Sequence, residues 1–104
     1  MKLEAGIYVR TNDGYINKIK KVNQYNVLVD ARDLFGEELN IPNNEILKAS
    51  HNIIDLIEVG DYVNGEYVDL FSLDYFKRNP EHIKSIVTKE QFESMAYKVV
   101  EEWK

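Results

Sequence analysis

The dipeptide Asn64-Gly65 is the feature that most constrains the fold of this chain. It separates two short runs rich in Val and Tyr, and Asn-Gly between such runs is the strongest local signal for a β-hairpin with a two-residue turn. Both residues accept the positive φ that a type I′ turn requires. A two-residue turn also fixes the cross-strand pairs, which are Tyr62 with Tyr67, Val63 with Glu66 and Asp61 with Val68.

The length and composition of the chain indicate one small domain, residues 1–104. Aliphatic and aromatic residues make up 44% of the sequence, which is enough for a single modest core. The N-terminus passes into strand-like sequence without an apolar leader, and no apolar run is long enough for a membrane span, so we expect a cytoplasmic protein. The absence of cysteine excludes disulfides, thiol nucleophiles and Cys-based metal sites.

Short strand-like segments separated by turn residues follow one another along the chain. Residues 6–10 and 15–19 flank Thr11-Asn12-Asp13-Gly14, which reads as a type I turn with a glycine bulge and places Ile7 opposite Ile19. Further strands are expected at 27–29, 37–41 and 53–57. This pattern predicts a mostly β fold, either a small SH3-like barrel or a strongly bent antiparallel sheet, with one or two short helices.

The helices are expected at two places. Residues 43–49 fit one or two helical turns behind an Asn cap. Near the C-terminus, Thr88 and Gln91 form a capping box, so we expect a helix over 89–95.

Two further segments are harder to assign. Apolar residues continue at helical spacing after residue 95, but Tyr97, Val99 and Trp103 also alternate as in a strand, which leaves helix and strand both open for 96–103. Residues 71–82 are the least regular part, and Arg78-Asn79-Pro80 should end any helix that begins there.

Three stretches of the sequence resemble small uncharacterised proteins encoded by phages and prophages of Firmicutes. They are the opening Lys2 to Thr11 with Asp13-Gly14, the segment His51 to Gly65, and Ile86 to Phe92. The resemblance implies a phage or prophage accessory protein in the host cytoplasm, and it brings no catalytic residues with it. In those relatives a Tyr often follows Asn-Gly directly, whereas Glu66 does so here.

The sequence carries no constellation that catalysis or metal binding would require. Its two histidines, His51 and His82, lack a second ligand at metal-site spacing. Ser50, His51 and Asp55 are the residue types of a triad, but adjacent side chains of an extended segment point to opposite faces. The carboxylate pairs Asp30 with Asp33 and Asp55 with Glu58 are of a kind that polar loops also produce. We therefore predict a non-enzymatic protein with no catalytic, cofactor or metal site.

Charge is distributed unevenly along the chain. The formal net charge is −5, and the second half carries the acidic excess. Residues 55–74 contain no Lys or Arg and six acidic residues, which are Asp55, Glu58, Asp61, Glu66, Asp69 and Asp74. This pattern predicts a solvated acidic face or a patch for a basic partner, and a phosphate backbone would be repelled by it.

A local basic cluster supports an alternative function. The hairpin lysines Lys18, Lys20 and Lys21 lie near tyrosines in the sequence, and small barrels bind single-stranded nucleic acid through lysines and stacked aromatics. The sequence pI of about 5.0 argues against a nucleic-acid partner.

The favoured function is a small protein-interaction module for a protein of host or phage origin. In the predicted hairpin register, Tyr62 and Tyr67 stand side by side near Glu58 and Asp69, which would combine aromatic contact area with acceptors for Lys or Arg. The opposite face would then supply the core, with Val59, Val63, Val68 and Leu70. In the alternative arrangement, the tyrosines are buried under residues 71–82.

Overall fold

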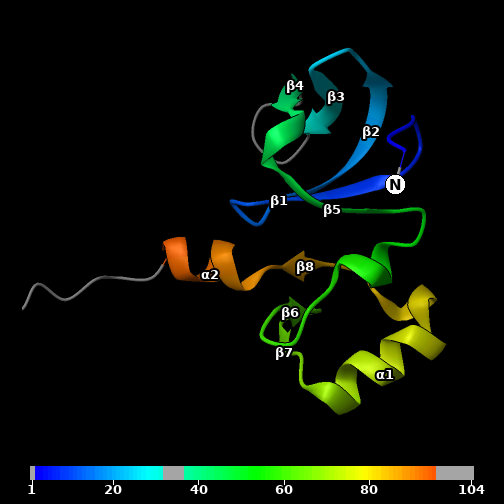
Figure 1. The fold of residues 1–104 in the computed structure, drawn as a ribbon. Helices are drawn as coiled ribbons and strands as arrows, with labels where there is room; N and C mark the ends of the chain where they lie inside the picture. The colour runs from blue at the N-terminus through cyan, green and yellow to red at the C-terminus, as the bar shows by residue number, and fades with distance from the viewer. Residues whose placement is uncertain (1, 32–36, 96–104) are drawn as a thin grey trace, which may run out of the picture.

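The computed structural model describes residues 2–31 and 37–95 and contains two antiparallel sheets with two short helices (Figure 1). The five-stranded sheet comes first in the chain, and its strands follow in the order β4-β3-β2-β1-β5. Its members are β1 (Tyr8–Thr11), β2 (Ile16–Val22), β3 (Asn26–Ala31), β4 (Glu37–Pro42) and β5 (Ile46–Ser50). The mostly β class predicted from the sequence is confirmed.

The sheet bends strongly but does not close. Strands β4 and β5 occupy its two ends, and neither pairs with the other in the described part of the chain. The register of β1 with β5 shifts between Arg10 and Thr11, and the register of β2 with β3 shifts between Ile19 and Lys21. Such irregularities bend a strand and increase its twist, which explains the curled outline in Figure 1.

The first hairpin forms as its sequence predicts. Ile19 donates its backbone N–H to the carbonyl oxygen of Ile7 at 2.9 Å, so these two residues face each other. Gly14 adopts φ +87°, the left-handed conformation expected of the bulge residue. A Cβ at this position would lie 2.3 Å from the Thr88 hydroxyl oxygen, so both conformation and space require glycine here.

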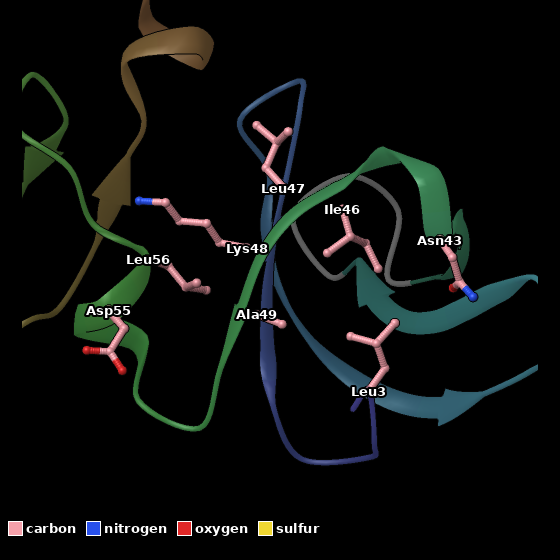
Figure 2. A pocket seen from close by; sticks show the side chains of 8 residues that line it. All are labelled: Leu3, Asn43, Ile46, Leu47, Lys48, Ala49, Asp55 and Leu56. Atoms are coloured by element: carbon pink, nitrogen blue, oxygen red, sulfur yellow. The ribbon is translucent and has the colours of Figure 1, made fainter. Parts of the chain in front are cut away.

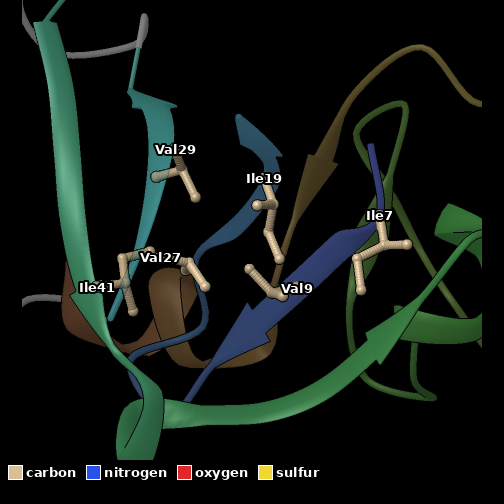
Figure 3. Close-up of a cluster of buried hydrophobic side chains, with 6 residues drawn as sticks. All are labelled: Ile7, Val9, Ile19, Val27, Val29 and Ile41. Carbon is tan, nitrogen blue, oxygen red and sulfur yellow. The ribbon is translucent and has the colours of Figure 1, made fainter. Parts of the chain in front are cut away.

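Aliphatic side chains from one face of the bent sheet form the first core (Figure 3). All are at most 4% exposed, and they alternate with outward-facing residues along each strand. The members are Ile7, Val9, Ile19, Val27, Val29 and Ile41.

The second half of the chain forms a smaller sheet and both α-helices. The sheet has the order β7-β6-β8, and α1 ends where Asn79-Pro80 was expected to stop a helix. The elements are η2 (Ile53–Leu56), β6 (Tyr62–Val63), β7 (Glu66–Tyr67), α1 (Leu70–Arg78), η3 (Pro80–His82), β8 (Ile86–Val87) and α2 (Lys89–Met95).

The Asn64-Gly65 hairpin has the predicted register. Tyr62 pairs with Tyr67 and Val63 with Glu66, while the turn residues adopt φ of +55° and +81°. The extra Glu after Asn-Gly therefore does not shift the pairing.

A second core lies beneath this hairpin. Its buried members are Ile54, Ile57, Val63 and Val68, and α1 covers them with Leu73 and Phe76. Residues 71–82 therefore pack on the valine face of the hairpin rather than on the tyrosines. The segment was predicted to be irregular, but Asp69 caps a nine-residue helix there by accepting a hydrogen bond from the Ser72 backbone N–H at 2.8 Å.

Two predicted elements have a different form in the structure. The predicted strand at 53–57 is the 3₁₀ helix η2, because Ser50 donates its hydroxyl to Asp55 and accepts the Asn52 backbone N–H, which bends the chain. A short apolar run does not distinguish these two conformations. In place of the predicted helical turns at 43–49, the chain forms the short 3₁₀ helix η1 (Asn43–Glu45), which has no side-chain cap. The residues that follow it pair with β1 and therefore form the strand β5.

The capping box at the start of α2 is confirmed. The Thr88 hydroxyl oxygen accepts the Gln91 backbone N–H at 3.3 Å, and the Gln91 side-chain oxygen accepts the Thr88 backbone N–H at 3.1 Å. The choice between helix and strand for 96–103 lies outside the described residues.

Candidate functional site

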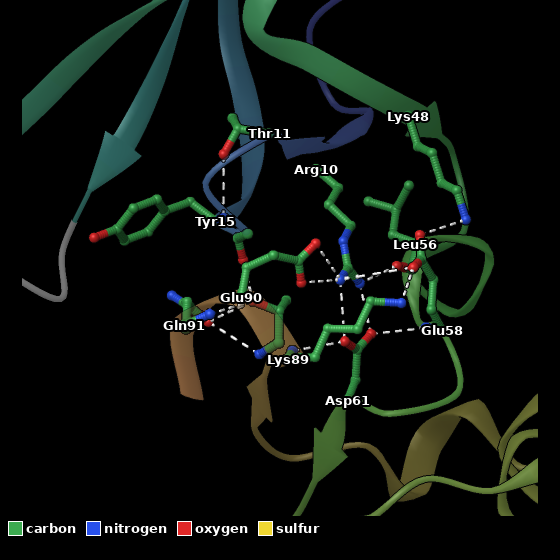
Figure 4. Close-up of polar contacts among 12 residues, drawn as sticks. Arg10, Thr11, Tyr15, Lys48, Leu56, Glu58, Asp61, Lys89, Glu90 and Gln91 are labelled. Carbon is green, nitrogen blue, oxygen red and sulfur yellow. Dashed lines mark hydrogen bonds and ion pairs between the residues drawn. The ribbon is translucent and has the colours of Figure 1, made fainter. Parts of the chain in front are cut away.

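Arg10 is buried where β1 meets the second half of the chain (Figure 4). Its alternation with Val9 places it on the outward face of the five-stranded sheet, and the loop before β6 covers that face. One terminal nitrogen donates to the Leu56 carbonyl at 2.8 Å and to Asp61 at 2.5 Å, and the other donates to Asp61 at 3.0 Å and to Glu90 at 2.7 Å. Arg10 therefore ties β1 to three separate segments.

Asp61 is the fully buried partner of this arginine. Besides the bidentate pair with Arg10, it accepts the backbone N–H groups of Glu58 at 2.7 Å and Lys89 at 2.9 Å. Burial disfavours the charged guanidinium, but the hydrogen bond and charge of Asp61, with smaller contributions from Glu58 and Glu90, raise the pKa of Arg10. The Arg10 guanidinium therefore remains charged.

Glu58 forms the outer part of the same cluster. Its carboxylate lies 2.8 Å from the Lys48 ammonium and 2.7 Å from the Lys89 ammonium. Hydrogen bonds from these two lysines lower the pKa of Glu58 from 4.5 to about 2, against the opposing effect of its partial burial. Three cations and three carboxylates are thus matched in one cluster, here called the ionic cluster: Arg10, Lys48, Lys89, Glu58, Asp61 and Glu90.

The ionic cluster links β1, β5 and the loop before β6 to α2. Each of its three carboxylates accepts hydrogen bonds or ion pairs from cations of the same cluster. Of the six acidic residues between 55 and 74, Asp55, Glu66, Asp69 and Asp74 are exposed, as the predicted solvated acidic face requires. Asp61 is buried and Glu58 is partly buried, and these two pair with distant cations instead.

The predicted interaction surface is assembled only in part. The rings of Tyr62 and Tyr67 lie edge to face with centroids 5.8 Å apart, as the hairpin register requires. Phe92 of α2 stacks on Tyr62 at a centroid distance of 4.6 Å. Tyr67 is 56% exposed and Phe92 is 50% exposed, so these three rings form an accessible surface, here called the aromatic surface.

The two predicted carboxylate members of that surface have other roles. Glu58 belongs to the ionic cluster, and Asp69 is the N-cap of α1, where the hydrogen bond from the Ser72 backbone N–H lowers its pKa. The predicted core face is also only half correct. Val63 and Val68 are buried, but Val59 is 39% exposed before the turn at Gly60, and Leu70 is 73% exposed at the start of α1.

The sequence did not indicate that Phe92 belongs to the aromatic surface or that Arg10 belongs to the ionic cluster. Thr88 and Gln91 predicted the helix that carries Phe92, but nothing in the sequence placed that helix beside the hairpin. Arg10 sits 51 residues before Asp61, and an outward-facing strand arginine has no local mark of burial.

The basic hairpin does not form a continuous patch. Lys20 pairs with Glu38, whereas the Lys18 ammonium lies 5.7 Å from the centroid of the Tyr8 ring, its cross-strand neighbour. Tyr25 is 75% exposed in the β2–β3 turn, beyond the paired residues of both strands. Lys18 and Tyr8 are therefore the members of the predicted cluster that meet.

Neither histidine sits in a metal-binding group within residues 2–31 and 37–95. His82 lies 2.5 Å from the Tyr75 hydroxyl, and His51 lies 3.4 Å from Glu4. Ser50 donates to Asp55 at 2.5 Å rather than to a histidine. The candidate triad is therefore not assembled.

A hollow of about 450 Å³ follows the free edge of β5 (Figure 2). Four consecutive strand residues line it, from Ile46 to Ala49, with Leu3 on the core side and Asp55 and Leu56 across from them. Consecutive residues of a strand point to alternate faces, so a hollow that all four reach lies along the backbone edge.

Searches with this chain found no matching protein-family model, no matching curated protein and no matching solved structure. None of the described helices is long and apolar enough to cross a membrane.

Proposed function

We propose that this chain is a non-enzymatic protein-interaction module and that the aromatic surface is where its partner binds. The observation that carries the proposal is the cluster of Tyr67, Tyr62 and Phe92, in which Tyr67 and Phe92 are about half exposed. Large aromatic side chains of this kind are enriched at protein interfaces, where they bury much area at a small entropic cost.

The geometry of the rings supports a preformed binding surface. Tyr62 contacts both Tyr67 and Phe92, and the strand and helix that carry Tyr62 and Phe92 are fixed by β6–β8 pairing and by the Thr88 capping box. Binding to such a surface requires little ordering of side chains, which favours affinity.

The chemistry of the partner differs from that expected from the sequence alone. Glu58 already accepts hydrogen bonds or ion pairs from two lysines of the chain, and Asp69 uses Oδ1 to cap α1, so less carboxylate remains for a Lys or Arg of the partner. Met95, which is 70% exposed one helical turn after Phe92, extends the surface with another apolar side chain. An apolar or aromatic anchor of the partner fits this composition best.

The resemblance of the sequence to phage and prophage proteins supports a role as an accessory protein of that origin. We therefore propose to search for the partner in infected or lysogenic host cells.

The test compares the parent chain with one double variant and one single variant, both with substitutions at exposed positions. Tyr67→Ser combined with Phe92→Ser removes the accessible rings, and Tyr25→Ser removes a still more exposed tyrosine from the β2–β3 turn. Circular dichroism and thermal melts first establish that all three proteins are folded. In affinity capture from lysogenic cells, we expect the double variant to lose partners that the parent and Tyr25→Ser retain. A folded double variant that captures every partner of the parent would contradict the proposal.

A further inference from the structure

A groove runs along the outward face of β1 and β2, on the side opposite the first core. Three adjoining hollows of about 460, 360 and 300 Å³ make it up. They share lining residues at each junction, which are Tyr8, Ile53 and Pro80 at one and Tyr15, Ile86 and Gln91 at the other. Because neighbouring hollows share these walls, they form one continuous groove between the five-stranded sheet and the segment from η3 to α2.

Branched aliphatic side chains form the middle of the groove. Ile16, Ile53, Ile83 and Ile86 all line it and are each partly exposed. Tyr8 and Tyr15 add aromatic walls, and Tyr15 is 48% exposed. Apolar side chains of a ligand would find matching contacts here.

The charge of the groove is opposite to that of the chain. The sequence has 18 acidic and 13 basic residues, yet among residues 2–31 and 37–95 none that lines these three hollows is acidic. Lys77 and Lys84 line the groove, and the Lys18 ammonium stands over the Tyr8 ring. None of these three lysines forms an ion pair within the described part of the chain, whereas Lys48 and Lys89 are paired.

We propose that this groove binds an extended peptide that carries acidic and apolar side chains. The free lysines supply complementary charge for carboxylates, and the isoleucines accept the apolar side chains between them. Side-chain amides and a hydroxyl from Asn17, Gln91 and Ser85 offer hydrogen-bond partners for the peptide backbone. The groove adjoins the aromatic surface at Met95, but none of Tyr62, Tyr67 and Phe92 lines it, so the inference goes beyond the proposed function.

A single-stranded nucleic acid fits the groove less well. Such ligands depend on a positive surface that follows the backbone and on aromatic platforms for successive bases. Here two tyrosines are separated by an isoleucine-rich floor, and the lysines are few. Aliphatic contacts favour a peptide, because bases gain more from stacking than from contact with branched aliphatic chains.

The probe is a pool of fluorescein-labelled decapeptides randomised among Glu, Asp, Leu and Ile, measured by fluorescence anisotropy. A pool with Lys and Arg in place of the acids, and the oligonucleotide (dT)10, provide the comparisons. The variant Lys77→Glu/Lys84→Glu reverses charge in the groove, and Lys2→Glu/Lys21→Glu makes the same charge change at exposed lysines that do not line it. All four sites are exposed, and circular dichroism verifies that both variants are folded.

We expect the acidic pool to bind the parent about tenfold more tightly than the basic pool, and the groove variant to weaken that binding about tenfold more than the control variant does. Tyr15→Ser should weaken it as well, through loss of apolar contact. The proposal is overturned if the acidic pool does not bind, if both double variants weaken binding equally, or if (dT)10 binds more tightly than the acidic pool. The last result would assign the groove to single-stranded nucleic acid.

Discussion

Replacing Arg10 with Met should destabilise the fold more than any change at an exposed ion pair. The substitution keeps an unbranched side chain that packs in the same space and removes the guanidinium. It deletes the hydrogen bonds to the Leu56 carbonyl and both Asp61 oxygens, and it leaves Asp61 fully buried with two backbone donors. Removing one member of a buried pair generally costs about 3–5 kcal/mol, because the remaining charge loses its partner.

The structure sets where in this range the loss should fall. Asp61 retains the backbone N–H groups of Glu58 and Lys89, which satisfy part of its hydrogen-bonding capacity. Glu90 is only partly buried, so water can replace its contact with Arg10. We therefore expect a loss near the lower end, about 3 kcal/mol in the free energy of unfolding.

Urea unfolding monitored by circular dichroism measures this loss. Lys20→Met serves as the matched control, since it removes an exposed partner of Glu38 and should cost less than about 1 kcal/mol. The double variant Arg10→Met/Asp61→Asn should recover part of the stability, because the neutral amide strands no charge and its oxygen can still accept a backbone N–H of Glu58 or Lys89. If Arg10→Met were no more destabilising than Lys20→Met, the ionic cluster would not hold the two sheets together.

Three other outcomes follow from particular residues. A Cβ at position 65 meets open space, so Gly65→Ala should cost only about 1 kcal/mol of stability for its left-handed conformation. Gly14→Ala has the same conformational cost and also clashes with Thr88, so it should lower the melting temperature clearly more. Equal losses for the two variants would contradict the close contact between position 14 and Thr88. The pKa of Glu58 is about 2 in the folded protein against its usual 4.5, so its contribution to stability is present above pH 4.5 and is lost as the pH falls toward 2. Between pH 4.5 and 2, the free energy of unfolding should therefore change less with pH in Glu58→Gln than in the parent. An equal slope in the two proteins would refute the assignment. Duplex DNA should show no binding near 150 mM salt, because the net charge is −5; micromolar binding that weakens steeply with added salt would overturn this expectation.

Local signals in the sequence predicted the turns and their registers. Asn64-Gly65 and Gly14 have few alternatives to a left-handed turn, and the Thr88–Gln91 capping box is complete within four residues. The alternation of side-chain directions along a strand then predicted which residues of the first hairpin face inward, and the burial of Ile7 and Ile19 confirms this prediction. These features depend on neighbours in the chain, so a single sequence suffices for them.

Contacts between distant segments could not be read in the same way. The apolar run at 53–57 suits a strand or a 3₁₀ turn equally well, and the hydroxyl of Ser50 decides between them. The sequence places Glu58 on a binding surface, since its ion pairs cannot be read from neighbouring residues. Its cationic partners Lys48 and Lys89 lie 10 and 31 residues away. In the aromatic surface, the Tyr62–Tyr67 pair could be predicted from the hairpin register. The contact of Phe92 with Tyr62 could not be predicted, because it depends on the position of α2 in the fold.

The most direct test of the proposed function is a map of the partner's footprint on the protein. Two-dimensional amide NMR spectra of the isotopically labelled chain would be recorded with and without the partner recovered from lysogenic cells. We predict that the largest chemical-shift changes fall at residues 62–67 and 89–95, which carry the aromatic surface. Changes confined to β3 and β4, with Tyr67 and Phe92 unaffected, would contradict the claim that this surface binds the partner.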